Sequence, residues 1–188
     1  MIVESIITTL EPAGGAHIAP MGVIWNEGVP VLAPFRPSLT LDNLLRTRQA
    51  VINHTDDVRV FAGCLTGHAD WPLRAATRVA GHVLEGALSH QEIEIERIEE
   101  DAVRPRLVGK VVHEESHAPF RGFNRAQAAV IEAAILASRL HLLPWEKIER
   151  ELAYLEIAVS KTAGPREREA WDWLTVHIAL ERRGRATA

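Results

Sequence analysis

The stretch HIAPMGVIWNEGVPVLAPF, residues 17–35, decides the fold class of this chain. It holds two apolar, β-favouring runs separated by Asn26-Glu27-Gly28, which we interpret as a tight three-residue hairpin loop with glycine at a positive φ. An earlier β-rich run, residues 2–9, is separated from residue 17 by a turn around two consecutive glycines. The sequence therefore predicts an antiparallel meander of three strands.

The rest of the first half continues this strand-rich pattern around one short helix. Ser38 or Thr40 can cap that helix, because leucines follow on one side at helical spacing. Further β-rich or apolar runs occupy residues 50–54, 58–64, 79–88, 92–96 and 106–113. The acidic run at 92–96 alternates cleanly, and we expect it to pair with the basic run at 106–113.

The periodicity changes to that of helices after residue 118. Asn124 can cap a helix that runs to about residue 142, Pro144 suits the first turn of a second, and Trp171 lies in a third. The fold class predicted is α+β. We expect an antiparallel, barrel-like β domain over residues 1–118 and a three-helix C-terminal extension over residues 119–188.

Composition excludes several classes of function. The 188 residues carry a formal net charge of −4, which gives no basic stripe for nucleic acid. The single cysteine, Cys64, cannot form an internal disulfide, and no apolar run approaches the ~20 residues of a membrane span. We therefore expect a cytoplasmic protein with no nucleic-acid partner and no membrane segment.

Residues 113–117, His-Glu-Glu-Ser-His, match the H-E-x-x-H signature of zinc proteases. That chemistry needs both histidines on one face of a helix, but the run before His113 is strand-like and Pro119 follows closely. We interpret the segment as a strand end with exposed charged residues and predict no metal ligands. A zinc hydrolase using His113 and His117, with Glu132 as a third ligand, stays open as an alternative.

A second motif lies where the third strand ends and the short helix begins. Ser38 and Thr40 are spaced S-x-T at the helix N-terminus, and Arg36 precedes them. Free N–H groups at a helix start favour phosphate, and hydroxyls and a guanidinium add donors. The alternative is that both hydroxyls are ordinary helix caps and that Arg36 is a surface charge.

The order of several short motifs resembles the FMN-binding split-barrel superfamily of flavin reductases, flavoredoxins and pyridoxamine-phosphate-oxidase-like proteins. The motifs are residues 19–23 (APMGV), 38–40 (SLT), 50–53 (AVIN), 55–58 (TDDV) and 122–126 (GFNRA). Within that superfamily the chain is most similar to an uncharacterised branch, a domain of unknown function with a helical tail. The resemblance spans nearly the whole chain.

The resemblance implies a split β-barrel, FMN as the cofactor and a homodimer with the flavin at the interface. It assigns the phosphate to Ser38 and Thr40, with Arg36 as a further partner. The ring and ribityl chain are assigned to Met21, Gly22, Val23, Asn53, His54 and Thr55. One departure is the lack of the lysine or second arginine that oxidase-type relatives often place near the phosphate.

The function predicted is that of a flavin-reductase-like oxidoreductase that uses a small-molecule electron donor or substrate. The helical-tailed branch implies a link to pterin-type one-carbon cofactor metabolism. No residue stands out as a catalytic acid. The alternatives are a non-catalytic flavin carrier or sensor, the zinc hydrolase described above, and a cofactor-free barrel that assembles with partners through its tail. The pattern does not distinguish FMN from a deazaflavin.

Overall fold

The computed structural model describes residues 1–186, and the chain divides into two compact units. The barrel unit comprises Met1–Thr55 and Trp71–Phe120. The helical unit comprises Asp56–Asp70 and the chain from Arg121 onward. The barrel unit is therefore interrupted in sequence, whereas the sequence-based division at residue 118 is continuous.

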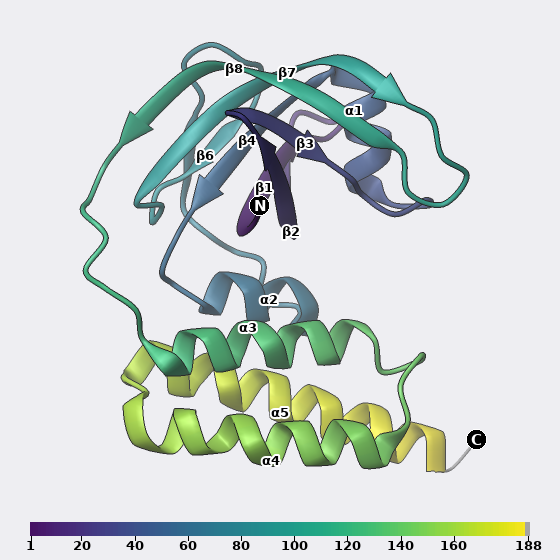
Figure 1. Ribbon diagram of the computed structural model, residues 1–188, viewed down its shortest axis with the longest axis vertical. Coiled ribbons are helices and arrows are strands. Elements are labelled where there is room, and N and C mark those ends of the chain that lie inside the picture. Colours follow the sequence, from purple (N-terminus) through teal and green to yellow (C-terminus); the bar gives the residue numbers. More distant parts are fainter. Residues whose placement is uncertain (187–188) are drawn as a thin grey trace. The chain divides into compact units, whose positions relative to one another are not determined.

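The barrel unit is an antiparallel barrel that closes in the order β1-β2-β3-β8-β7-β4 (Figure 1). Its strands are β1 (Ile2–Leu10), β2 (Ala16–Asn26), β3 (Val29–Leu32), β4 (Gln49–His54), β7 (Ser89–Glu99) and β8 (Arg106–Ser116). The meander of β1, β2 and β3 is confirmed. The hairpin loop is shorter than predicted, because Asn26 pairs with Val29 and leaves only Glu27 and Gly28, both at positive φ.

The barrel interior is aliphatic, and side chains alternate between it and the outer face. Ile7, Ile52, Ile93 and Leu107 are fully buried in one cluster. Burying each such side chain contributes roughly 1.5–3 kcal/mol. On the outer face, the hairpin of β5 (Leu73–Ala75) and β6 (His82–Leu84) brings Val79 and Val83 onto Val51. Of the weakly alternating run at 79–88, only residues 82–84 form a strand.

Charge pairing between β7 and β8 follows the prediction. Glu94 lies opposite Lys110, and Glu99 lies opposite Arg106. The register shifts between Glu92 and Ile93 and again between Ile95 and Arg97, so the ladder contains β-bulges.

The short helix predicted after the third strand is α1 (Leu39–Thr47). Ser38 is its N-cap, and Leu41 and Leu44 are buried in the barrel cluster. Figure 1 shows α1 and β6 on opposite sides of the barrel.

The helical unit contains α2 (Arg59–Thr66), α3 (Arg125–Ser138), α4 (Trp145–Thr162) and α5 (Pro165–Ala186). The three tail helices and the Asn124 cap are confirmed, although α3 ends at Ser138, before residue 142. One side of α3 carries a stripe of small residues, namely Ala126, Ala129, Ala133, Ala134 and Ala137, and it is buried, with Ala126 and Ala133 fully covered. Within residues 1–186 no helix is both long and apolar enough to cross a membrane.

The inclusion of residues 58–64 in the strand-rich pattern was wrong, because this run forms α2. The carboxylate of Asp57 accepts a hydrogen bond from the Arg59 N–H at 3.2 Å and holds the first turn. Val58 and Ala62, one helical turn apart, are buried in the core of the helical unit. Short apolar runs do not distinguish strand from helix, and here packing decides.

Candidate functional site

The approach to α1 carries the polar groups of the predicted phosphate motif. Ser38 has an extended backbone, with φ −160° and ψ 147°, and its Oγ accepts a hydrogen bond from the Leu41 N–H at 3.2 Å. Arg36 is exposed and pairs with exposed Glu100 at 3.5 Å. The first N–H groups of a helix have no partner within the helix and carry partial positive charge. This loop therefore presents donors to solvent.

Thr40, by contrast, is buried, and its hydroxyl lies 3.1 Å from Nε2 of His17 on β2. Burial lowers the pKa of His17, although the negative charge of Glu11 opposes this shift. The lowered pKa favours a neutral ring near pH 7. The contact connects α1 to the beginning of β2. Sequence reasoning missed His17, although its place at the start of a strand beside a glycine turn was a usable signal.

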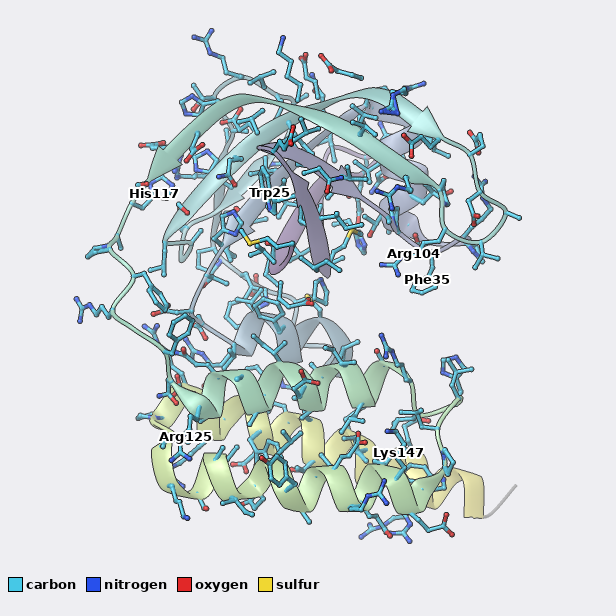
Figure 2. All side chains as sticks on the ribbon, in the orientation of Figure 1. Trp25, Phe35, Arg104, His117, Arg125 and Lys147 are labelled. Carbon is cyan, nitrogen blue, oxygen red and sulfur yellow. The ribbon has the colours of Figure 1, made fainter. Side chains whose placement is uncertain are left out.

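A second arginine reaches the same loop. The guanidinium of Arg104 lies over the ring of Phe35, 4.8 Å from its centroid, and its Nε donates to the Ala33 carbonyl at 2.6 Å (Figure 2). The Arg36 N–H also donates to the Val103 carbonyl at 2.8 Å, which fixes the two loops together. Arg104 is therefore a second arginine beside this loop, and the departure stated from the sequence, that no second arginine lies near the phosphate, stays a prediction. Arg104 follows β7 in the sequence, so only the pairing of β3 with β8 reveals it.

The predicted ring-binding residues of β2 differ in what they present. Val23 is fully buried in the barrel cluster, and Met21 packs against that cluster from its edge. Gly22 lies opposite Glu4, and an added Cβ would lie 2.7 Å from Cγ2 of Ile2. A neighbouring strand thus accounts for the glycine. Residues 16–22 are all half-buried, so neither face of β2 is fully covered there.

Asn53 lies inside the protein and has no exposed surface. Its amide donates to the Ile6 carbonyl at 3.1 Å, and its Oδ1 accepts from the Leu84 N–H at 2.8 Å. This side chain therefore joins β1, β4 and β6. In this structure it positions strands and presents no free group.

His54 and Thr55 follow at the end of β4. His54 is half-buried, with Nδ1 3.3 Å from Oγ of Ser5 and Nε2 2.7 Å from Oε1 of Gln91. Thr55 donates its hydroxyl to the Gly86 carbonyl at 3.2 Å. Ser5 lies opposite Met21 in the register of β1 and β2. Ser5 on β1 therefore lies between His54 on β4 and Met21 on β2, and no signal in the sequence singled it out.

The segment matching H-E-x-x-H lies at the end of β8 and not in a helix, as predicted. Two parts of that interpretation change. Glu132 belongs to the helical unit, and the imidazoles of His113 and His117 are only 28% and 21% exposed. Both rings gather with buried His90 of β7, at centroid distances of 5.7 and 5.1 Å. A strand cannot reproduce the helical protease arrangement, so the alternative of a zinc hydrolase built that way is wrong.

Family models of known proteins match both the N-terminal and the C-terminal part of the chain. The family model described as the N-terminal domain of a protein of unknown function, DUF447, matches residues 3–118, and that of the C-terminal part matches residues 124–175. An FMN-bound protein from Methanosarcina mazei, of the same family model, aligns with a TM-score of 0.80 at 20% identity over 94% of each chain.

Two further structures align with a part of the chain. The 2-nitrobenzoate 2-nitroreductase of Pseudomonas fluorescens has a TM-score of 0.52 at 19% identity, over 61% of this chain and 64% of that one. An FMN-binding protein from Thermus thermophilus has a TM-score of 0.52 at 15% identity, over 61% of this chain and 71% of that one. These similarities confirm the split-barrel fold.

Proposed function

The chain belongs to the DUF447 family, and we propose that it binds FMN and acts as a flavin-reductase-like oxidoreductase. The observation that carries the proposal is the donor set at the start of α1. Ser38 lies at the helix N-terminus, and the guanidiniums of Arg36 and Arg104 belong to the two loops that meet beside it. Such a set suits a phosphate monoester, because helix N–H groups, a hydroxyl and guanidiniums all donate.

The half-buried face of β2 supports a place for the rest of the cofactor. His17, Ala19 and Met21 are every second residue of β2 and therefore lie on one face of the strand. His17 contacts Thr40 at one end of this row, and Met21 lies opposite Ser5, which contacts His54, at the other. Backbone groups and Met21 on this strand would contact the flavin, and His54 would lie at its far edge. The FMN-bound family member and the FMN-binding Thermus protein support the choice of FMN.

Bound FMN would supply the electron-transfer chemistry, and the protein would supply position and electrostatics. His17 beside Thr40 gives the phosphate site a titratable neighbour, and His54 is held by Ser5 and Gln91 in a fixed orientation. The link to pterin-type one-carbon cofactor metabolism stays a prediction. So does the alternative of a carrier, which would hold FMN without accepting electrons from a donor.

The test is visible absorbance after incubation with FMN and desalting, compared between the wild type and Ser38→Asp. Aspartate caps a helix as well as serine does, but its charge repels a phosphate. We expect the wild type to retain the flavin band and Ser38→Asp to bind FMN about 10- to 100-fold more weakly. Ser160→Asp, at an exposed position of α4, changes the net charge equally and should bind normally.

A matched arginine pair refines the assignment. Arg104→Gln should weaken FMN binding about fivefold, which is typical of a partly exposed charge contact. Arg106→Gln should have a smaller effect, because the guanidinium of Arg106 already pairs with Glu99 at 3.3 Å. Wild-type protein that takes up no FMN would disprove the proposal. If FMN is retained but never bleached by a nicotinamide donor, the carrier is the better description.

The homodimer with flavin at the interface is part of the same proposal. The incompletely covered faces of β2 offer a surface that a second copy would bury. Sedimentation equilibrium with and without FMN tests this. We expect a dimer, and a monomer that binds FMN fully would separate cofactor binding from assembly.

A further inference from the structure

A compact group of imidazoles and carboxylates lies on the outer face of β7 and β8. The strand register places His90 opposite Glu115 and Glu92 opposite His113. His117 follows the end of β8, and its Nε2 lies 2.9 Å from Nδ1 of His90. One ligand atom from each of His90, His113 and Glu115 lies within 4.8 Å of the others. We call these three residues and His117 the histidine cluster.

Glu92 holds the cluster's buried histidine in place. Its carboxylate is fully buried and accepts three backbone hydrogen bonds, from the N–H groups of Thr77, Arg78 and Val79 at 2.7, 2.6 and 3.0 Å. The same carboxylate lies 3.4 Å from Nε2 of His90. Histidines that bind metals commonly donate their second ring N–H to a carboxylate in this way, which leaves the first nitrogen free for the ion.

In this cluster, two neutral histidines cannot supply a proton to every close contact between nitrogen and oxygen or between two nitrogens. A guanidinium only donates, so Nε2 of His117 accepts from Arg74 at 2.9 Å. Nδ1 of His90 then either donates to the same atom or faces it with a lone pair. If a neutral His90 donates from Nδ1, its Nε2 lone pair faces the carboxylate of Glu92. One repulsive contact remains in either tautomer.

A proton or a metal cation could remove that repulsion, and water cannot, because the ring of His90 is fully buried. A cation between the two rings would replace the repulsion with two bonds to nitrogen.

His113 supplies a further free lone pair or proton. Its Nε2 is buried and has no hydrogen-bond partner among the residues that the structure describes. The nearest carboxylate oxygen of Glu115 is 3.9 Å away. Buried polar atoms normally have a partner, and each exception calls for one. Glu115 itself is half-exposed and can turn toward this nitrogen.

We propose that the histidine cluster binds one divalent first-row transition-metal ion of the zinc type. His90, His113 and Glu115 supply two imidazoles and a carboxylate within 4.8 Å of one another. His117 lies outside that group of three but contacts His90, and it would complete a tetrahedral set that suits Zn²⁺, whereas Ca²⁺ and Mg²⁺ prefer oxygen ligands. Ligands around tetrahedral zinc lie about 3.4 Å apart, so His90 and His117 are already near their bound separation, and His113 and Glu115 move inward. Arg74, which contacts His117 and Glu115, is a competing cation that the ion displaces.

The test titrates Zn²⁺ into the chelator-treated full-length protein, in competition with a chromophoric chelator. We expect one Zn²⁺ per chain. His113→Ala and Glu115→Gln, both at the partly exposed end of β8, should each weaken binding by more than about tenfold. His141→Ala, an exposed histidine of the helical unit, should bind as the wild type does. Co²⁺ in place of Zn²⁺ should give the visible bands of a tetrahedral site.

Arg74→Gln separates a metal site from a network that only stabilises the barrel. Removing the competing guanidinium should tighten Zn²⁺ binding, because His117 and Glu115 are released. Two results would overturn the proposal. One is a wild-type protein that binds no Zn²⁺, and the other is a His113→Ala variant with unchanged affinity. Circular dichroism of each variant verifies that the fold is retained.

Discussion

The barrel unit and the helical unit bury polar side chains in different ways. Of the described residues, the buried polar ones of the barrel unit are Ser5, Thr8, Thr9, Thr40, Asn43, Asn53, His90 and Glu92, against Asp57 and Glu167 in the helical unit. Partners in the barrel are distant in sequence, as when Asn53 accepts from the Leu84 N–H. In the helical unit each buried carboxylate also accepts from a backbone N–H within three residues, as when Glu167 accepts from the Gly164 N–H, although Gln127 donates to Glu167 as well.

This difference explains where chemistry gathers. The buried polar side chains of the barrel unit meet partners from other strands, so their contacts depend on the strand register. The register brings together clusters such as His90 with His113 and His117. The helical unit uses its two buried carboxylates at the beginnings of α2 and α5, and elsewhere it packs small residues such as Ala133. Three substitutions test the contrast, from the largest effect to the smallest.

The largest loss of stability is expected for Glu92→Ala in metal-free protein. The variant leaves three backbone N–H groups without their acceptor, and each unsatisfied buried donor is costly. We expect the free energy of unfolding to fall by about 3 kcal/mol or more, measured by urea denaturation. Glu94→Ala, an exposed neighbour on the same strand, should change it by less than about 0.5 kcal/mol. An equal loss of unfolding free energy in both variants would show that the buried carboxylate contributes no more to stability than an exposed one.

An intermediate loss is expected in the helical unit for Ala133→Leu. Ala133 has no exposed surface, and its neighbours in the cluster include Ala129, Ala137 and Leu174. The added atoms should destabilise the protein by about 1–3 kcal/mol through overpacking. Ala128→Leu, exposed on the same helix, is the control and should be nearly neutral. A neutral Ala133→Leu would mean that the stripe is loosely packed.

The smallest loss is expected for Asp57→Asn, and it should depend on pH. Burial opposes ionisation of Asp57, but hydrogen bonds and charge from Arg59, with Arg166, outweigh it and lower the pKa. Because the folded pKa is lowered, the carboxylate stabilises the protein above its unfolded pKa of about 3.9, and this contribution is lost as pH falls through the folded value.

At pH 7 we therefore expect Asp57→Asn to lower the free energy of unfolding by about 1 kcal/mol. The gap between variant and wild type should close below about pH 4, which denaturation at several pH values would measure. Asp172→Asn, exposed on α5, should show no such gap. A gap that widens in acid would reverse the assigned direction of the shift.

The sequence predicted those features that are local. The S-x-T motif, its helix cap and the hydrophobic stripe of α1 lie within a few residues of one another, and so do the Asn124 cap and α3. Arg104 and His17 were missed because their positions depend on which strands pair. The histidine cluster was missed because the bulge at Glu92 and Ile93 sets the register between β7 and β8. Helix α2 was missed because eight residues are too few to display a helical period.

The placement of α2 has a consequence for how the protein is made. On the ribosome, residues 56–70 emerge long before α3, α4 and α5, which supply most of the rest of their hydrophobic cluster. The apolar face formed by Val58 and Ala62 therefore stays incompletely buried until synthesis has passed Ile178. A fragment that stops near residue 120 would complete the barrel strands yet carry an unpaired helix in their middle. We therefore expect that the N-terminal half does not fold as an independent domain, because the C-terminal helices complete a unit that begins with residues 56–70, between the two sequence segments of the barrel unit.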